Sequence, residues 1–256
     1  MNTTITYEFP LNERIRVFIR LEQLFQQFNH FLTGETVADK RAAISILLDI
    51  MTIFRRNDLK SEILKELDRH ANVLNKIAHN QGVDTLKLEE LLDTLSQTSK
   101  KLYATNGKIG THVMESDLFQ SIAQRSSIPG GTCSFDLPEF HYWLEQDEAT
   151  RLKDMQHWSS PFADIRTAID LILNFIRNCS SPTQEVAEAG FFQFLLDTNQ
   201  PHQLLKVSLD KSIHCFAEIS GGKHRCTIRF MVPSSDNKRP SQSPDDIPFA
   251  LTCCLF

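Results

Sequence analysis

Three cations recur at short intervals near the end of the chain, at Lys223, Arg225 and Arg229. They lie in a segment, Lys223 to Val232, in which polar and apolar residues alternate. Successive side chains of a strand point to opposite faces, so alternation places all three cations on one face. The remaining residues of that face are Thr227 and Met231, while the opposite face is mostly apolar.

This basic face has the chemistry of an anion-binding surface. Lys223 and Arg229 lie roughly 20 Å apart in an extended strand. Arginine presents planar pairs of donors that match carboxylates and phosphates. The pattern therefore fits an extended acidic peptide or a phosphate backbone. The alternative is a solvated outer face of an antiparallel sheet, where cations discourage edge pairing. Alternation alone favours this alternative.

A second basic cluster follows an apolar helical stripe and consists of Arg55, Arg56 and Lys60. Cations near a helix C-terminus interact favourably with the helix dipole. The cluster by itself therefore favours a structural role over a binding site.

The motifs of common enzymes are missing from the sequence. Gly107–Thr111 imitates only the end of a phosphate-binding loop and lacks the glycine five residues upstream. No dinucleotide-binding GxGxxG and no zinc-binding HExxH occurs, and the nine histidines have no ligand spacing. We therefore expect no enzyme, no cofactor and no metal site.

The six cysteines show no CxxC pair and no disulfide-like spacing. They are typical of reduced cytosolic thiols that lie mostly in the core. Cys133 lies in a stretch, 131–135, that imitates a nucleophile elbow but ends in Phe135 instead of glycine. We expect Cys133 to be a buried structural thiol, and a thiol enzyme stays an alternative. Cys253 and Cys254 are adjacent, so they point to opposite faces and suit a metal poorly.

Helices are predicted over most of the chain, because apolar residues recur at spacings of three and four. Asp58, Asp84 and Asp147 are predicted to cap three of them. The segment 133–138 is expected to be extended. The predicted stripes run from Leu11 to Leu32, Ile44 to Phe54, Leu59 to Ile77 and Leu88 to Leu102, with further helices over 115–125 and after Glu139, Asp147 and Ser160.

From about residue 185 the period of the pattern becomes two, which predicts strands. Gly221 and Gly222 are expected to form a hairpin turn that needs positive φ. Residues 233–248 contain four prolines and are expected to be an exposed loop. The predicted strands cover Leu205–Leu209, Ile213–Ile219, Lys223–Val232 and Phe249–Leu255, together with an N-terminal strand over residues 3–9.

Together these elements predict an α+β fold. An N-terminal multi-helix domain, residues 10–180, is followed by a C-terminal antiparallel β-sheet domain, residues 181–256. The N-terminal strand within residues 1–9 has no local partner, so we expect it to join this sheet. No stretch of about 18 apolar residues occurs, and no secretory signal precedes the first strand. These features predict a cytoplasmic protein without a membrane partner.

The net charge of −5 disfavours a nonspecific nucleic-acid-binding protein, because such proteins are usually basic. The basic strand face also lacks aromatic residues on which bases could stack. A nucleic-acid-binding protein that uses this face nevertheless stays the alternative function.

Four pieces of the sequence, in register over about residues 5 to 254, resemble one family. Two of them are Glu8–Glu13, followed by a Phe-rich helix, and Leu64–Arg69. The most specific is Ser127–Gly131 followed by Cys133–Pro138, and the fourth is Ile219–Gly221 with the basic strand. The chain resembles the bacterial cell division protein ZapD, the Z-ring-associated protein D.

The resemblance implies a homodimer that binds the C-terminal tail of FtsZ, the tubulin-like GTPase of the division ring. Such a dimer cross-links and bundles FtsZ filaments at midcell, without a cofactor or catalysis. The basic pocket of the family maps onto Arg56, Arg225 and Arg229. Lys223 lies on the same strand face and is expected to help, while Arg55 and Lys60 are weaker candidates.

Two features depart from the family pattern. The loop 233–248 is richer in Pro and Ser than expected, and Leu255 and Phe256 extend beyond the double cysteine. Neither touches the basic positions, but both leave the geometry of the dimer and of the sheet edge open.

Overall fold

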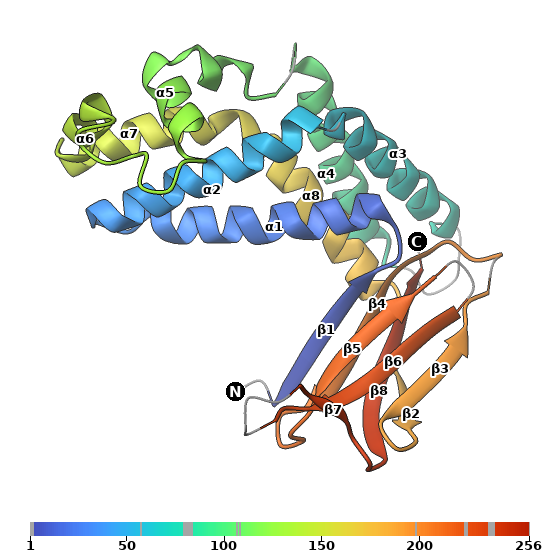
Figure 1. Ribbon diagram of the computed structural model, residues 1–256. Coiled ribbons are helices and arrows are strands. Elements are labelled where there is room, and N and C mark those ends of the chain that lie inside the picture. Colours follow the sequence, from blue (N-terminus) through green and yellow to red (C-terminus); the bar gives the residue numbers. More distant parts are fainter. Residues whose placement is uncertain are drawn as a thin grey trace. The chain divides into compact units, whose positions relative to one another are not determined.

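The computed structural model describes residues 3–56, 58–78, 84–105, 107, 109–197, 199–222, 225–234 and 239–255 (Figure 1). The chain divides into two compact units. One combines Met1–Phe18 with Leu173–Phe256, and the other is Ile19–Ile172. The sequence predicts a helical domain over 10–180 and a β-strand domain that combines 1–9 with 181–256. These domain boundaries remain a prediction.

Helices make up the unit Ile19–Ile172, and the α+β class predicted from the sequence is confirmed. No helix of the described residues is long and apolar enough to cross a membrane. The elements are α1 (Glu13–Leu32), α2 (Val37–Arg56), α3 (Leu59–Ile77), α4 (Thr85–Ala104), η1 (Thr111–Glu115), α5 (Asp117–Arg125), α6 (Pro138–Leu144), α7 (Glu148–Ser159), η2 (Ser160–Phe162) and α8 (Ala163–Asn178).

Three helix starts are fixed by the aspartates that the sequence indicates. The carboxylates of Asp58, Asp84 and Asp147 accept hydrogen bonds from backbone amides in the first turns of α3, α4 and α7. These bonds satisfy amides that have no partner inside a helix, and they thereby stabilise the first turn of each helix. The three predicted caps are confirmed.

Two cations of α2, one buried and one half-buried, connect elements within the helical unit. Lys40 on α2 is fully buried, and its Nζ donates to the carbonyl of Leu32 at the end of α1, 2.8 Å away. Arg41 donates to the carbonyl and hydroxyl oxygens of Thr132 and lies over the ring of Phe140. The Lys40 bond ties α2 to the end of α1, and the Arg41 contacts tie the segment before α6 to α2.

That segment differs from the sequence-based expectation. Residues 133–136 form turns, in which the amides of Asp136 and Leu137 donate to the carbonyl of Cys133. The expected extended conformation over 133–138 is therefore wrong. Short-range hydrogen bonds hold the segment, and the helix α6 already begins at Pro138.

Strands make up the unit that contains both ends of the chain. They form two antiparallel sheets, one in the order β1-β4-β8-β2 and one in the order β3-β6-β5, with β7 beside β6. The strands are β1 (Thr4–Pro10), β2 (Thr183–Ala187), β3 (Phe191–Leu195), β4 (His202–Asp210), β5 (Phe216–Gly221), β6 (Arg225–Val232), β7 (Ser241–Gln242) and β8 (Ile247–Leu255).

The N-terminal strand joins the C-terminal strands, as the sequence predicts. β1 pairs with β4 over its whole length, from Thr4 opposite Asp210 to Pro10 opposite Leu204. The expected loop over 233–248 is wrong in part, because β7 and the start of β8 fall inside it.

The larger of two apolar clusters among the described residues of this unit draws on both sheets. Phe230 of β6 and Phe249 of β8 have ring centroids 5.1 Å apart, and both are buried. Phe192 of β3 packs edge-on against Phe249, with centroids at 5.2 Å. Aromatic contacts of this kind add to the free energy gained by burying apolar area. The inward face of β6 is thereby fixed in this core.

The end of α8 is tied to the sheet that contains β1 by an ion pair. Arg177 donates from Nε and Nη2 to the two carboxylate oxygens of Glu8, both at 2.7 Å. Lys206 of β4 donates from Nζ to the carbonyl of Arg177 at 3.2 Å. These polar bonds link residues far apart in the sequence.

Candidate functional site

The basic face predicted from the sequence lies on β6, the strand between β3 and β5. Cys226, Ile228 and Phe230 are completely buried, whereas Arg225 and Arg229 are exposed. The two-residue period of a strand imposes this division, because the apolar face is held in the core. The predicted separation of the two faces is confirmed for the described residues.

The two arginines are separated along the strand by about 13 Å, the length of four extended residues. Within the described residues, neither guanidinium forms an ion pair with a carboxylate. Glu218 of β5 is exposed and lies directly opposite Arg229 in the register. Arg225 instead lies beside the hairpin turn. Its backbone carbonyl accepts a hydrogen bond from the amide of Gly222.

The hairpin between β5 and β6 positions Arg225 at the end of the strand. Gly221 lies opposite Cys226 in the register. A Cβ atom at Gly221 would lie 2.9 Å from the ring of Phe9 and 3.1 Å from the sulfur of Cys226. Glycine is therefore needed there for close approach. The expected positive φ at Gly221 and Gly222 is wrong, since both have ordinary φ angles.

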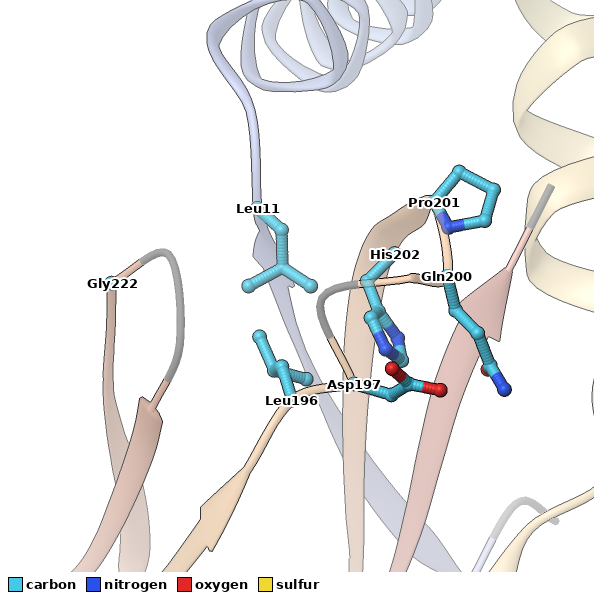
Figure 2. A pocket seen from close by; sticks show the side chains of 7 residues that line it. All are labelled: Leu11, Leu196, Asp197, Gln200, Pro201, His202 and Gly222. Atoms are coloured by element: carbon cyan, nitrogen blue, oxygen red, sulfur yellow. The ribbon is translucent and has the colours of Figure 1, made fainter.

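Two depressions flank this hairpin and share Gly222. The first has a volume of about 230 Å³, and Figure 2 shows its side chains. Leu11 and Leu196 belong to one apolar cluster there. Both ring nitrogens of His202 are buried and lack a hydrogen-bond partner within the described chain. The lining residues are Leu11, Leu196, Asp197, Gln200, Pro201, His202 and Gly222.

The second depression is an open groove on the outer side of the hairpin. It is lined by Ser220, Gly221, Gly222, Arg225 and Thr227 and has a volume of about 360 Å³. The exposed arginine at its edge makes it suitable for a carboxylate or phosphate. A Cβ atom at Gly222 would meet no other atom within 4 Å, so the backbone at this position borders open space.

The structure brings only part of the predicted site together. Arg225 and Arg229 share one face, but Lys223 lies outside the described residues. Arg56 ends α2, and its side chain also lies outside the described residues. Arg55 is exposed, and Lys60 is engaged, since its Nζ donates to the carbonyl of Thr105 at 2.6 Å. Lys60 therefore caps the end of α4.

The expectation for Cys133 is wrong, because this thiol is exposed. It belongs to the turn before α6, in which Ser134 and Phe135 are exposed as well. Among the described side chains, no histidine is hydrogen-bonded to it. Within the described residues, the thiol therefore has no partner of the kind that activates a nucleophilic cysteine.

A pair of thiols that the sequence pattern did not indicate lies where α8 ends beside β8. Cys179 is exposed and Cys254 is buried. The Cys254 thiol donates a hydrogen bond to Cys179, and this bond lowers the pKa of Cys179 to about 6. The same bond, together with burial, raises the pKa of Cys254. The fold brings Cys179 and Cys254 together from distant positions in the sequence. Their spacing in the sequence therefore gave no sign of the pair.

Comparison with known proteins identifies similar chains along nearly the whole length. The sequence model of a family described as "ZapD: Cell division protein" matches residues 19–229. A protein of Methylococcus capsulatus named "Cell division protein ZapD" is 47% identical over 256 residues, covering 100% of both chains. Proteins of the same name from Nitrosomonas eutropha and Aromatoleum aromaticum are 39% and 36% identical, each over 250 residues and 98% of this chain, covering 99% and 97% of their own lengths.

Proposed function

Because this chain belongs to the ZapD family of cell division proteins, and so has a role in cell division, we propose that it binds the C-terminal tail of FtsZ. The proposed contact is between carboxylates of the tail and the outer face of β6. As a homodimer the protein then cross-links and bundles FtsZ filaments in the cytoplasm, at the division ring at midcell.

The observation that carries this proposal is the pair of exposed arginines on a rigid strand. Arg225 and Arg229 are held on one face because Cys226, Ile228 and Phe230, on the opposite face of the strand, are buried. An exposed arginine without an ion pair can donate two hydrogen bonds to an incoming carboxylate at little desolvation cost. Two such groups about 13 Å apart suit an extended peptide with acidic residues.

The proposed roles of the other cations differ in their structural support. Arg56 joins the site in this proposal as a further donor to the tail, as the family resemblance implies. Lys223 joins it because alternation places Lys223 on the same strand face as the two arginines. Arg55 is exposed and available for a weaker contribution. Lys60 contributes least, because its ammonium group already donates to Thr105.

Cross-linking follows from having two copies of the same site. A monomer with one tail site would decorate filaments, whereas a dimer holds two tails at once. When both sites engage one bundle, the second binding event is intramolecular, and modest single-site affinity becomes strong avidity. The proposal requires no cofactor and no catalytic residue.

Co-sedimentation with FtsZ filaments tests this function. The wild-type protein should increase the pelleted FtsZ at low centrifugal force, and Arg225→Gln combined with Arg229→Gln should abolish the increase. Arg20→Gln is the matched control, since Arg20 is an exposed arginine on α1. If FtsZ lacking its tail is bundled as well as intact FtsZ, the proposed site is wrong.

The alternative, a nucleic-acid-binding protein, would use the same face. The neighbouring strand β3 places Phe191 opposite Arg229, so the lack of stacking aromatics holds for β6 alone. A steep fall in affinity for DNA or RNA with added salt, at a site removed by the same double substitution, would favour this alternative over tail binding.

A further inference from the structure

An exposed apolar row runs along β3 beside the arginines of β6. The register of the two strands is antiparallel, and outward-facing residues lie directly opposite one another. These cross-strand pairs are Phe191 with Arg229, Gln193 with Thr227 and Leu195 with Arg225. Each arginine therefore has a large apolar side chain as its neighbour on the same face.

The apolar core does not use the side chains of this outer row. Leu195 is 77% exposed and Phe191 is 38% exposed. The inward face of β3 already supplies Phe192 and Phe194, which pack against the buried residues of the two sheets. A strand with one face in water normally alternates apolar and polar residues. β3 instead carries apolar residues on both faces, so its outer row is available for a partner.

We propose that β3 is the apolar half of the peptide site on β6, an inference that rests on the proposed function. The partner segment is then an extended acidic peptide in which apolar side chains accompany the carboxylates. The carboxylates contact Arg225 and Arg229, and the apolar side chains cover Leu195 and Phe191. The recognised peptide therefore carries both carboxylates and apolar side chains, at spacings that match the two rows.

The spacing of the two rows supports a single occupant. Leu195 and Phe191 are four residues apart, as are Arg225 and Arg229, so each row repeats after about 13 Å. Adjacent strands lie about 4.8 Å apart, a distance that one peptide side chain can span. An extended peptide can therefore contact an arginine and its apolar neighbour at both ends of the face.

Charge complementarity and water exclusion act together at such a site. Covering Leu195 removes apolar area from water and also keeps water away from the adjacent Arg225–carboxylate bond. Electrostatic bonds are stronger where water is excluded. The apolar contribution to peptide affinity should therefore be insensitive to added salt. The electrostatic contribution of the arginines should fall as salt is added.

Fluorescence anisotropy with a labelled FtsZ tail peptide tests the inference. Leu195→Ser and Phe191→Ser should each weaken binding about tenfold, as expected for the loss of one apolar side chain that the peptide covers. Their salt dependence should equal that of the wild type, because no charge changes. Val186→Ser is the matched control, since Val186 is 52% exposed on β2 of the other sheet and should bind normally. Arg225→Gln should weaken binding and flatten the salt dependence.

Replacing the apolar residues of the peptide by serine provides a second measurement with the protein unaltered. It should reproduce the loss seen with Leu195→Ser, and combining both changes should add little further loss.

The outcomes separate the inference from the proposed function. Normal binding by Leu195→Ser, with weak binding by Arg225→Gln, overturns the inference and leaves the proposed function standing. Normal binding by Arg225→Gln and Arg229→Gln overturns the proposed function itself. If Leu195→Ser converts a dimer to a monomer in sedimentation equilibrium, the row is covered by a second copy of the chain, and the inference is wrong.

Discussion

Two arginine environments in the β-strand unit differ in what surrounds the guanidinium. Arg177, at the end of α8, makes two hydrogen bonds of 2.7 Å to Glu8 and is 24% exposed in its side chain. Arg225 and Arg229, on β6, are exposed and form no ion pair with any described carboxylate. The residue type is the same, but only Arg177 has its charge balanced within the fold.

The difference indicates separate tasks for the two environments. A partly buried, bidentate ion pair holds α8 to β1, and its loss leaves a carboxylate without its partner. Exposed, unpaired arginines contribute little to folding, since surface charges change stability by small amounts. The β6 arginines are therefore free to act on a partner, and substitutions should separate binding from stability.

The largest effect is expected from reversing the charge of both β6 arginines. Arg225→Glu with Arg229→Glu should weaken tail-peptide affinity by about 100-fold or more, because attraction becomes like-charge repulsion. Thermal unfolding should stay within about 2 °C of the wild type. Anisotropy and a melting curve measure the two quantities. A large drop in melting temperature would mean that the β6 arginines stabilise the fold, as Arg177 does, and would contradict the comparison.

The opposite pattern is expected at Arg177. Arg177→Gln should lower the free energy of unfolding by about 2 kcal/mol, because the Glu8 carboxylate loses a bidentate partner. Peptide affinity should stay unchanged. Urea denaturation of the single variants and of the Arg177→Gln, Glu8→Gln double variant measures the coupling between the two residues. Additive losses would show that the ion pair contributes no net stability.

A smaller effect is expected from removing the carboxylate that faces Arg229. Glu218→Gln should strengthen peptide binding about threefold, because Glu218 lies opposite Arg229 and competes with an incoming anion. Glu89→Gln removes an exposed carboxylate on α4 and is the control. Equal gains from both variants would point to net charge rather than to this pair.

The smallest effect concerns Cys179, two residues after Arg177. The pKa of Cys179 is lowered to about 6 by the hydrogen bond from Cys254, so its thiolate should predominate at neutral pH. Iodoacetamide should modify it at a rate that rises around pH 6, and Cys254→Ala should move that rise to higher pH. Cys179→Ser identifies the signal in mass spectra. An unchanged profile in Cys254→Ala would exclude the hydrogen bond as the cause.

Local patterns were sufficient to predict most of the helices and strands and one face of the site, but not the strands β2, β3 and β7. Alternation placed Arg225 and Arg229 together because the core fixes which side of β6 is buried. Asp58, Asp84 and Asp147 were predictable as caps because capping depends on residues within one helical turn.

Properties that depend on register could not be predicted in the same way. That Leu195 faces Arg225 depends on which strand pairs with β6 and in what register, and alternation leaves both open. The bond between Glu8 and Arg177 joins residues 169 positions apart. The requirement for Gly221 is likewise set by Phe9, which comes from another strand.

Site-specific photocrosslinking from Thr227 tests the central claim most directly. Thr227 lies between the two arginines on the exposed side of β6, and it is only partly buried. A benzophenone amino acid at this position should crosslink to the C-terminal tail of FtsZ, and the same group at Val186 should not. Crosslinks from Thr227 that map only to the globular part of FtsZ, or that persist with tail-deleted FtsZ, would contradict the account.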